Sequence, residues 1–540
     1  MEARKWKMSE FAAASSASYA NPFWDVQVRA EFVHPASGTR QSANAYYDGL
    51  DDTGSQCWKV RWTPVHEGSW LCRIWSVPAN EQLEARFQVE ALPAEEGSKG
   101  FLRADTEASY GFRFDNGEPY FLFGDTMYNV FGAHYCDVDV ESIFSHRKSQ
   151  GVNYIRARLQ VSPYHPEVAN QWQTKDLWPW GGSAQMPVFT KLNLAYFKAV
   201  DEVVAMGAKL GIGFEMIPEG WLFEFPFNDR GKFLPEYEAF WNSYIVARYA
   251  AFSSVYIWCP ANEYEFYPLG TPGRLKESNR WFKGLTKQIR GEDPYAHPIG
   301  AHNWEKVVPL HERLGDCETV DVFLVQTEWG TETEKWTKDA SLCIGIESDM
   351  KHHFGTGNKV CVCAEFGYER AEGLLTAGGH QRMDHHHTRR GQWRAGFSGY
   401  AVVHGFDNTW GAHMRLDKDP IGAAYLPLYY RFMTETLRFD RLAPSPESLL
   451  SASGSEKEGT LPLCLRDAGA GVTAVYFPAT GFCELPEALT ERASFQWYNP
   501  RTGQMNERER CERPLFTTPE SAEGTPGGDD WVLLVEAVQV

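Results

Sequence analysis

Hydrophobic and polar positions alternate over short stretches in the first part of the chain. The clearest case is the series Trp58, Val60 and Trp62, in which every second residue is apolar, and Gly, Pro, Asn and Asp separate such stretches from one another. A period of two is typical of strands that bury one face, and frequent turns are typical of antiparallel sheets. We therefore expect residues 1–97 to form an accessory β-sandwich domain.

Apolar runs separated by helical patterns fill the middle of the chain, from residue 98 to residue 440. Eight runs have the length and composition of buried strands: 120–126, 152–159, 208–215, 254–263, 297–303, 320–328, 359–367 and 399–410. A helical pattern or a long loop follows each run, which predicts a (β/α)8 barrel. A doubly wound parallel sheet is the alternative, but no glycine-rich phosphate loop follows any of the runs.

Short alternating stretches return from residue 441 onwards. Asn-Pro, Thr-Gly and Gly-Gly turns separate them, and residues 492–504 and 529–540 are examples. This pattern predicts a second small antiparallel β domain over residues 441–540. The expected fold class is α/β, a TIM barrel over residues 98–440 between two β domains.

Composition narrows the range of partners. A net charge of −19 over 540 residues argues against nucleic acid or an anionic membrane as a partner. No apolar run is long enough to span a bilayer, and residues 1–16 lack the apolar core of a signal peptide. The 11 cysteines are scattered rather than arranged as a disulfide framework, so we expect reduced thiols and a cytoplasmic location.

Polar side chains stand at the carboxyl ends of the eight predicted strands, where a barrel of this kind carries its chemistry. A purely structural role for these positions would favour small or apolar residues. In chain order the polar and aromatic residues at these ends are Asp125, Arg156, Glu215, Asn262, Glu263, His302, Asn303, Gln326, Glu365, Asp407 and Trp410. Any one of them could be a helix cap or an ion-pair partner, but the set together indicates a site.

Two of these residues form a candidate catalytic pair. Glu263 ends the fourth strand behind Asn262, and Glu365 ends the seventh strand. Strands four and seven lie nearly opposite each other across an eight-stranded barrel, so two carboxyl groups there can approach a ligand from two sides. Cleavage of a glycosidic bond requires such a pair, because one carboxyl group protonates the leaving oxygen and the other acts at the anomeric carbon.

The motifs at these strand ends resemble those of a known family. "NE" after the fourth strand and "EFG" after the seventh are similar to the clan of retaining (β/α)8 glycoside hydrolases. More narrowly, an N-terminal β domain followed by "GEPYFLFGDTMYN" (117–129) and "NEY" (262–264) resembles the apiosidase-like glycosidases. The resemblance covers residues 20 to 440, and a C-terminal β domain is also common in such proteins.

The resemblance implies a role for each matching residue. Glu263 would be the general acid/base and Glu365 the nucleophile, with Asn262 hydrogen-bonded to the hydroxyl next to the anomeric carbon. Arg156 would keep Glu365 ionised, while aromatic neighbours such as Tyr264 would raise the pKa of Glu263. The remaining residues expected to bind the terminal sugar are Asp125, His302, Gln326, Tyr368 and Trp410. Some relatives have Asp where others have Glu, so Glu215 and Glu265 stay as reserve carboxylates.

Two further features admit more than one interpretation. Trp178 and Trp180 follow the second strand and could form a wall of the sugar pocket or pack in a subunit interface. His385, His386 and His387 could supply at most two ligands from one helix, so we expect no metal and favour a solvated loop or a loop at the rim of the site, with its role left open. We expect no cofactor.

These observations predict a cytoplasmic, exo-acting, retaining glycoside hydrolase that forms a homo-oligomer and acts on oligosaccharides or glycosides. A furanose substrate is suggested only by the resemblance. The alternatives are a transglycosylase with the same carboxylates and a noncatalytic carbohydrate-binding protein.

Overall fold

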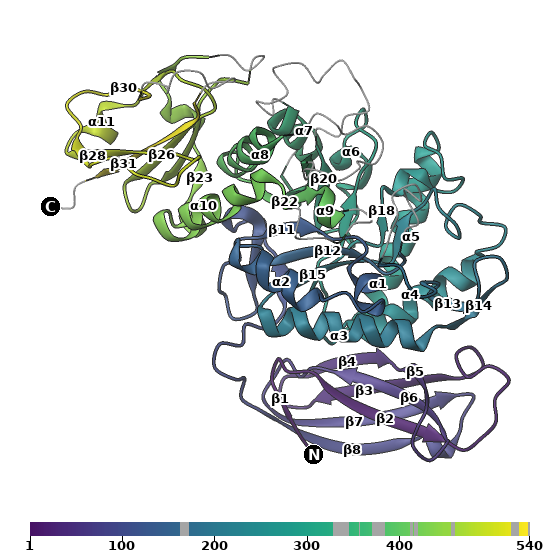
Figure 1. Cartoon of the computed structure of the whole chain (residues 1–540). Helices are drawn as coiled ribbons and strands as arrows, with labels where there is room; N and C mark the ends of the chain where they lie inside the picture. Colours follow the sequence, from purple (N-terminus) through teal and green to yellow (C-terminus); the bar gives the residue numbers. More distant parts are fainter. Residues whose placement is uncertain are drawn as a thin grey trace.

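The chain folds into three consecutive parts in the computed structural model, which describes residues 1–161, 172–327, 345–355, 357–369, 384–410, 414, 419–454, 459–519 and 529–537. A β-sandwich at the N-terminus packs below a central barrel, and a smaller β domain adjoins the barrel on the opposite side (Figure 1). The predicted α/β fold class, a TIM barrel between two β domains, is confirmed.

Two sheets form the N-terminal sandwich. The sheet orders are β1-β8-β7-β3-β4 and β2-β6-β5. The strands are β1 Glu2–Arg4, β2 Ser9–Ser15, β3 Gln27–His34, β4 Thr39–Asn44, β5 Tyr46–Leu50, β6 Gln56–Trp62, β7 Gly68–Val77 and β8 Ala85–Leu92. Trp58, Val60 and Trp62 are buried together in the core between the sheets, as their alternation predicts.

Eight parallel strands form the barrel. They are β11 Phe123–Thr126, β12 Tyr154–Arg158, β15 Gly213–Ile217, β17 Val255–Trp258, β19 Gly300–His302, β20 Val322–Gln326, β21 Val360–Glu369 and β22 Ala401–Phe406. The hydrogen-bonded order is β17-β15-β12-β11-β22-β21-β20-β19, and a parallel bridge between Trp258 and Ile299 closes the ring. Each strand overlaps one of the eight predicted runs.

Helices cover the outside of the barrel between these strands (Figure 1). They are α1 Val130–Tyr135, α2 Val140–Ser149, α3 Leu194–Leu210, α4 Pro235–Tyr249, α5 Leu275–Glu292, α6 Leu310–Leu314, α7 Gly345–Phe354, α8 His385–Phe397, α9 Asp407–Trp410 and α10 Leu426–Arg431. In α3, the Asn193 side chain accepts from the Tyr196 N–H at the start, and left-handed Gly211 ends the helix.

Two strands differ from the prediction at their carboxyl ends. The third run was expected to end at Glu215, but β15 continues to Ile217, so Glu215 lies in the middle of a strand. The fourth strand is interrupted at Cys259-Pro260, because proline cannot donate to the ladder. The chain then forms β18 (Ala261–Asn262), which pairs with β16 (Glu219–Trp221) outside the main sheet.

The three consecutive histidines open α8 rather than forming a loop. The Asp384 carboxylate accepts hydrogen bonds from the N–H groups of His386 and His387 and so caps the helix. The expectation of a rim loop is therefore wrong for His385–His387. A helix begins there because the capping carboxylate satisfies two of the free N–H groups in its first turn.

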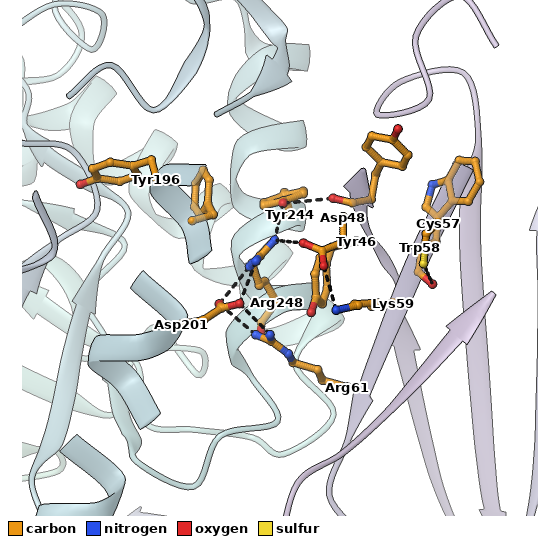
Figure 2. Close-up of polar contacts among 12 residues, drawn as sticks. Tyr46, Asp48, Cys57, Trp58, Lys59, Arg61, Tyr196, Asp201, Tyr244 and Arg248 are labelled. Carbon is orange, nitrogen blue, oxygen red and sulfur yellow. Dashed lines mark hydrogen bonds and ion pairs between the residues drawn. The ribbon is translucent and has the colours of Figure 1, made fainter. Parts of the chain in front are cut away.

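A buried charge network joins the sandwich to the barrel (Figure 2). Arg248 of α4 lies between Asp201 of α3, at 2.7 Å, and Asp48 of β5, at 3.1 Å. Arg61 of β6 also bonds Asp201, at 2.7 Å, and Lys59 bonds Asp48 at 2.8 Å. These ion pairs connect helices α3 and α4 of the barrel with strands β5 and β6 of the sandwich.

The C-terminal domain consists of a six-stranded and a three-stranded sheet, in the orders β23-β25-β26-β31-β28-β29 and β24-β27-β30. The strands are β23 Ala443–Pro444, β24 Ser451–Ala452, β25 Leu463–Asp467, β26 Val472–Phe477, β27 Phe482–Glu484, β28 Ala493–Tyr498, β29 Glu509–Arg510, β30 Leu515–Thr517 and β31 Trp531–Ala537. Arg389 of α8 bonds Asp530 at 3.1 Å and ties this domain to the barrel. We propose domain boundaries near residues 97 and 440, where β8 has ended and β23 has not begun.

No helix in the described part of the chain combines the length and the apolar character that crossing a membrane requires.

Candidate active site

Glu365 lies inside the barrel because of an irregularity in β21. Cys361 and Cys363 pack outwards against the helices, whereas Val362 and Ala364 belong to the barrel interior. Simple alternation would turn Glu365 outwards with the cysteines. The register shifts between Cys363 and Phe366, so Ala364 and Glu365 both face inwards. The bulge thus delivers a carboxylate to the barrel interior.

Two hydrogen-bond donors and an imidazole ring, from different elements, surround the Glu365 carboxylate. Arg156 donates to Oε2 at 3.1 Å from β12, and the Tyr128 hydroxyl donates to the same oxygen at 3.2 Å. His302 Nε2 lies 2.9 Å from that oxygen, although its N–H is not aligned for a hydrogen bond. His302 Nδ1 accepts from the Glu263 backbone N–H, which leaves the ring proton on the nitrogen that faces Glu365. These contacts favour the ionised form of Glu365.

Arg156 holds three of the predicted residues at fixed positions. Its Nε donates to Glu215 at 3.0 Å, and its two terminal nitrogens donate to Glu365 and, at 2.8 Å, to the Asn262 side-chain oxygen. Burial by itself lowers the pKa of Arg156, but the charges of Glu215 and Glu365 outweigh burial and raise it well above its usual value. The guanidinium is therefore a permanent cation at the centre of the site. Glu215 also accepts from the Tyr154 hydroxyl at 2.8 Å, so both of its oxygens are occupied by the protein.

Glu263 has a different environment from Glu365. Its backbone is left-handed, with φ 48° and ψ 54°, a strained conformation for a non-glycine residue that recurs at active sites. Its side chain accepts one hydrogen bond, from the Gln326 amide at 2.9 Å. Burial raises the pKa of Glu263 to about 8, and the negative charge of Glu365 contributes in the same direction. Glu263 is therefore a carboxylic acid at neutral pH.

The raised pKa of Glu263 predicts a pH-dependent cost to folding. The folded protein holds this proton up to about pH 8, whereas an exposed glutamate loses it near its ordinary value of 4.5. Stability therefore falls as pH rises between these values, because the folded state binds more protons than the unfolded state. Glu263→Gln removes this ionisation and keeps an acceptor for Gln326. Its apparent Tm, measured by calorimetry, should exceed that of the wild type by about 2 °C or more at pH 8.5. The difference should shrink at pH 5.5, and an equal difference at both pH values would contradict the assignment.

Among the described residues, two side-chain amide atoms of the cluster are buried and have no hydrogen-bond partner. They are the side-chain nitrogen of Asn262 and the side-chain oxygen of Gln326. A buried polar group without a hydrogen bond is costly, and such atoms in native proteins commonly serve a ligand or a water. The first can donate to a sugar hydroxyl and the second can accept from one.

Aromatic rings lie next to the carboxylates. Trp410 lies 6.1 Å from the ring of Tyr128 and 6.0 Å from that of Trp221. Arg158, two residues beyond Arg156 on β12, stacks on Trp221 at 4.0 Å and on Tyr128 at 4.6 Å. Tyr128, Trp221 and Arg158 were not predicted as site residues. The alternation of β12 puts Arg156 and Arg158 on one face and could have identified Arg158, whereas Tyr128 and Trp221 lie beyond the strand ends and carry no such signal.

Asp125 is not brought to this cluster. Like Phe123 on the same strand, it faces out of the barrel, where Arg147 of α2 donates to it at 2.7 Å and Thr409 at 3.1 Å. Burial raises its pKa to about 6 despite the pairing with Arg147. Its proposed contact with a sugar hydroxyl stays a prediction.

Trp180 and Tyr264 also lie away from the cluster. Trp180 is buried in the hairpin of β13 (Trp180–Gly182) and β14 (Pro187–Leu192), with its ring 4.4 Å from that of Trp241. The Tyr264 hydroxyl bonds Asn279 of α5 and Arg313 of α6, at 2.8 and 2.7 Å. Both side chains thus pack among the surrounding helices and loops, and their predicted roles at the sugar stay untested.

Tyr368 and Glu265 are the remaining predicted residues. The side chain of Tyr368 lies outside the described residues. The reserve carboxylate Glu265 is engaged by Arg313 and by the Trp304 N–H, at 3.0 Å. Within the described ranges, no three His, Cys, Asp or Glu side chains are grouped so that they could hold a metal ion.

Family models match all three parts of the chain. Residues 107–423 match the model described as "Apiosidase-like, catalytic domain". Residues 2–76 match a domain of unknown function (DUF5060), and residues 461–536 match a model provisionally described as a collagen-binding domain of a collagenase. No curated protein matches the chain in sequence.

Solved structures share the fold over most of the chain. A candidate glycoside hydrolase from Bacteroides vulgatus ATCC 8482 is 16% identical, with a TM-score of 0.70 over 99% of this chain and 100% of that one. A glycoside hydrolase family 5 protein from the same organism is also 16% identical, with a TM-score of 0.60 over 81% of this chain and 93% of that one. A third structure, described as a glycoside hydrolase, is 15% identical, with a TM-score of 0.57 over 81% and 97% of the two chains. At these identities, the likeness concerns the fold.

Proposed function

The chain belongs to the apiosidase-like family and is a glycoside hydrolase, and from this premise we propose that it cleaves its substrate with retention of configuration, with Glu365 as nucleophile and Glu263 as general acid/base. The observation that supports this proposal is the contrast between the two glutamates. Arg156, Tyr128 and His302 surround Glu365 and favour its carboxylate, whereas burial keeps Glu263 protonated at neutral pH. A double displacement requires these two opposite protonation states at its start.

In the first step, Glu365 attacks the anomeric carbon while Glu263 gives its proton to the leaving oxygen. The glycosidic bond breaks, an ester forms between Glu365 and the sugar, and the alcohol departs. The negative charge next to Glu263 decreases as Glu365 becomes an ester. The pKa of Glu263 then falls, because the charge of Glu365 contributes to its elevation.

In the second step, Glu263 has lost its proton and acts as a base towards water. Water attacks the anomeric carbon, its proton passes to Glu263, and Glu365 is released as a carboxylate. The Asn262 amide, held through its oxygen by Arg156, has a free N–H group to donate to the hydroxyl beside the reacting carbon. Gln326 positions Glu263 through its amide and offers its free oxygen to a second hydroxyl.

The finer properties of the enzyme are also part of the proposal. Long segments between strands and helices, such as residues 159–193 after β12, favour a pocket that admits a chain end, so we propose exo-action. A furanose as the released sugar rests on family membership alone. Because none of the ten cysteines within the described residues forms a disulfide, we further propose a reducing, cytoplasmic location, with the chain as a homo-oligomer.

A screen of 4-nitrophenyl furanosides and pyranosides, in both anomeric forms, tests the activity. One class of glycoside should be hydrolysed, and NMR of the first product should show the anomer of the substrate. Short oligosaccharides of the same sugar should release only monosaccharide. Product with the opposite anomeric configuration would contradict the mechanism, and hydrolysis of none of the panel would favour a noncatalytic binding protein. Transfer to an added alcohol in preference to water would indicate a transglycosylase.

A further inference from the structure

A cavity lies in the seam between the N-terminal sandwich and the barrel. Its volume is about 510 Å³, within the range of small-ligand sites. One wall comes from residues 23–24, 26–29 and 44–47 and from Trp58, and the other from α4 and from Glu292 of α5. None of its lining residues belongs to the cluster around Glu263 and Glu365. We call it the seam cavity.

The walls of the seam cavity are held in place by the charge network between the two domains. Tyr46, Trp58 and Tyr244 line the cavity and also lie in or beside this network (Figure 2). The Tyr244 hydroxyl accepts from Arg248 at 2.8 Å and donates to the Tyr47 carbonyl at 3.2 Å, which connects the two walls. A site with walls fixed in this way is formed before any ligand arrives, so binding costs less conformational entropy.

Several aromatic rings line the seam cavity. Trp24 is 40% exposed, although its ring lies 5.5 Å from Phe240 and 5.9 Å from Tyr237 of α4. Phe23 lies 4.7 Å from Tyr47, so the aromatic surface continues along the sandwich side. The apolar C–H faces of a sugar ring stack on such surfaces. Trp24 therefore offers a large ring face that the protein leaves partly open.

Polar groups of α4 and α5 also line the seam cavity. Glu292, the last residue of α5, has one carboxylate oxygen bonded to Ser243 at 2.8 Å and to Gln288 at 3.2 Å. Its second oxygen is buried and has no hydrogen-bond partner among the residues that the structure describes. Burial raises the pKa of Glu292. A ligand hydroxyl would satisfy this oxygen, which the fold itself leaves unpaired.

We propose that the seam cavity is a second, noncatalytic binding site for a neutral oligosaccharide. The ligand would stack one sugar ring on Trp24 and donate a hydroxyl hydrogen to Glu292, with Arg29 on the sandwich wall as a donor to ring or hydroxyl oxygens. The carboxylates Glu236 and Glu292 outnumber the single arginine of the lining, so an anionic ligand is disfavoured. The site would hold a saccharide near the enzyme while the barrel acts on a chain end.

Calorimetric titration of the full chain tests this proposal with cellotriose, mannotriose and galactotriose as separate probes. Glu365→Ala serves as the background, so that no probe is hydrolysed. At least one probe should bind, and Trp24→Ala should weaken its binding at least tenfold. Trp24→Phe, which keeps a ring face, and Trp410→Ala, at the barrel site, should retain the affinity. Glu292→Gln should weaken binding several-fold, and hydrolysis of a small chromogenic glycoside by the Trp24→Ala enzyme should be unchanged.

The proposal is wrong if none of the three probes binds. It is equally wrong if Trp24→Ala leaves the affinity unchanged while Trp410→Ala abolishes it, because the probe then occupies the barrel. The titration requires no turnover, so its failure is distinguishable from failure of the proposed hydrolytic mechanism.

Discussion

Replacing Glu365 by alanine should lower kcat by about 10⁵-fold or more, the scale seen when a catalytic nucleophile is removed. No other described carboxylate of the cluster can take its place. Glu215 is engaged by Arg156 and Tyr154, and Glu265 is engaged by Arg313. Steady-state hydrolysis of the best chromogenic glycoside measures the loss, which corresponds to about 7 kcal/mol of transition-state stabilisation.

The isosteric Glu365→Gln variant separates chemistry from folding. It keeps an oxygen to accept from Arg156 and Tyr128, and Arg156 retains Glu215 as its counter-charge. Its melting temperature should stay close to that of the wild type while its activity is lost. If this variant kept more than about 1% of kcat, Glu365 could not be the nucleophile.

Replacing Glu263 by alanine should have an effect that depends on the leaving group. A general acid contributes about 10²–10⁴-fold when the departing oxygen needs a proton. We expect kcat/KM to fall by about 10³-fold for a methyl or alkyl glycoside, and by less than about tenfold for a 2,4-dinitrophenyl glycoside, whose leaving group is stable without a proton. A series of aryl glycosides of graded phenol acidity measures this dependence. The Glu265→Gln variant is the matched comparison, and the same leaving-group dependence in that variant would transfer the acid role to Glu265.

The pH dependence of kcat/KM is an independent test of the protonation state of Glu263. The first step needs Glu263 in its protonated form, so kcat/KM of the wild type should fall as pH rises through about 8. This basic limb should be absent from the Glu263→Ala profile with the dinitrophenyl substrate. A basic limb that survives the substitution would belong to another group.

Much of the barrel could be predicted because its strands are buried on both faces and appear as apolar runs. All eight runs contain or overlap a strand, and the polar residues at their ends include Arg156, Asn262, Glu263 and Glu365, which the structure brings together. Periodicity was less informative about the direction of side chains. Strict alternation along β21 turns Glu365 outwards, and only the register with the neighbouring strands creates the bulge that turns it inwards.

Other site features depend on tertiary structure that one strand does not encode. Asp125 stands at the end of its strand, but it shares the outer face with Phe123 and meets Arg147 from a helix. Tyr128 and Trp221 reach the site from segments beyond the strand ends, so strand period does not identify them. The contacts of His302 with the backbone of Glu263 and with Glu365 bring together three separate segments of the chain and are visible only in space.

In the proposed mechanism, Glu365 and Glu263 act on opposite faces of the anomeric carbon. Rescue of the two alanine variants by azide tests this arrangement most directly. With a dinitrophenyl glycoside, Glu365→Ala should form the glycosyl azide of inverted configuration, because azide enters from the side that the nucleophile has vacated. Glu263→Ala should form the azide of retained configuration, because azide attacks the ester on Glu365 without help from a base. NMR of the two glycosyl azides determines their anomeric configurations. Azides of the same configuration from both variants, or a retained azide from Glu365→Ala, would contradict the assignment.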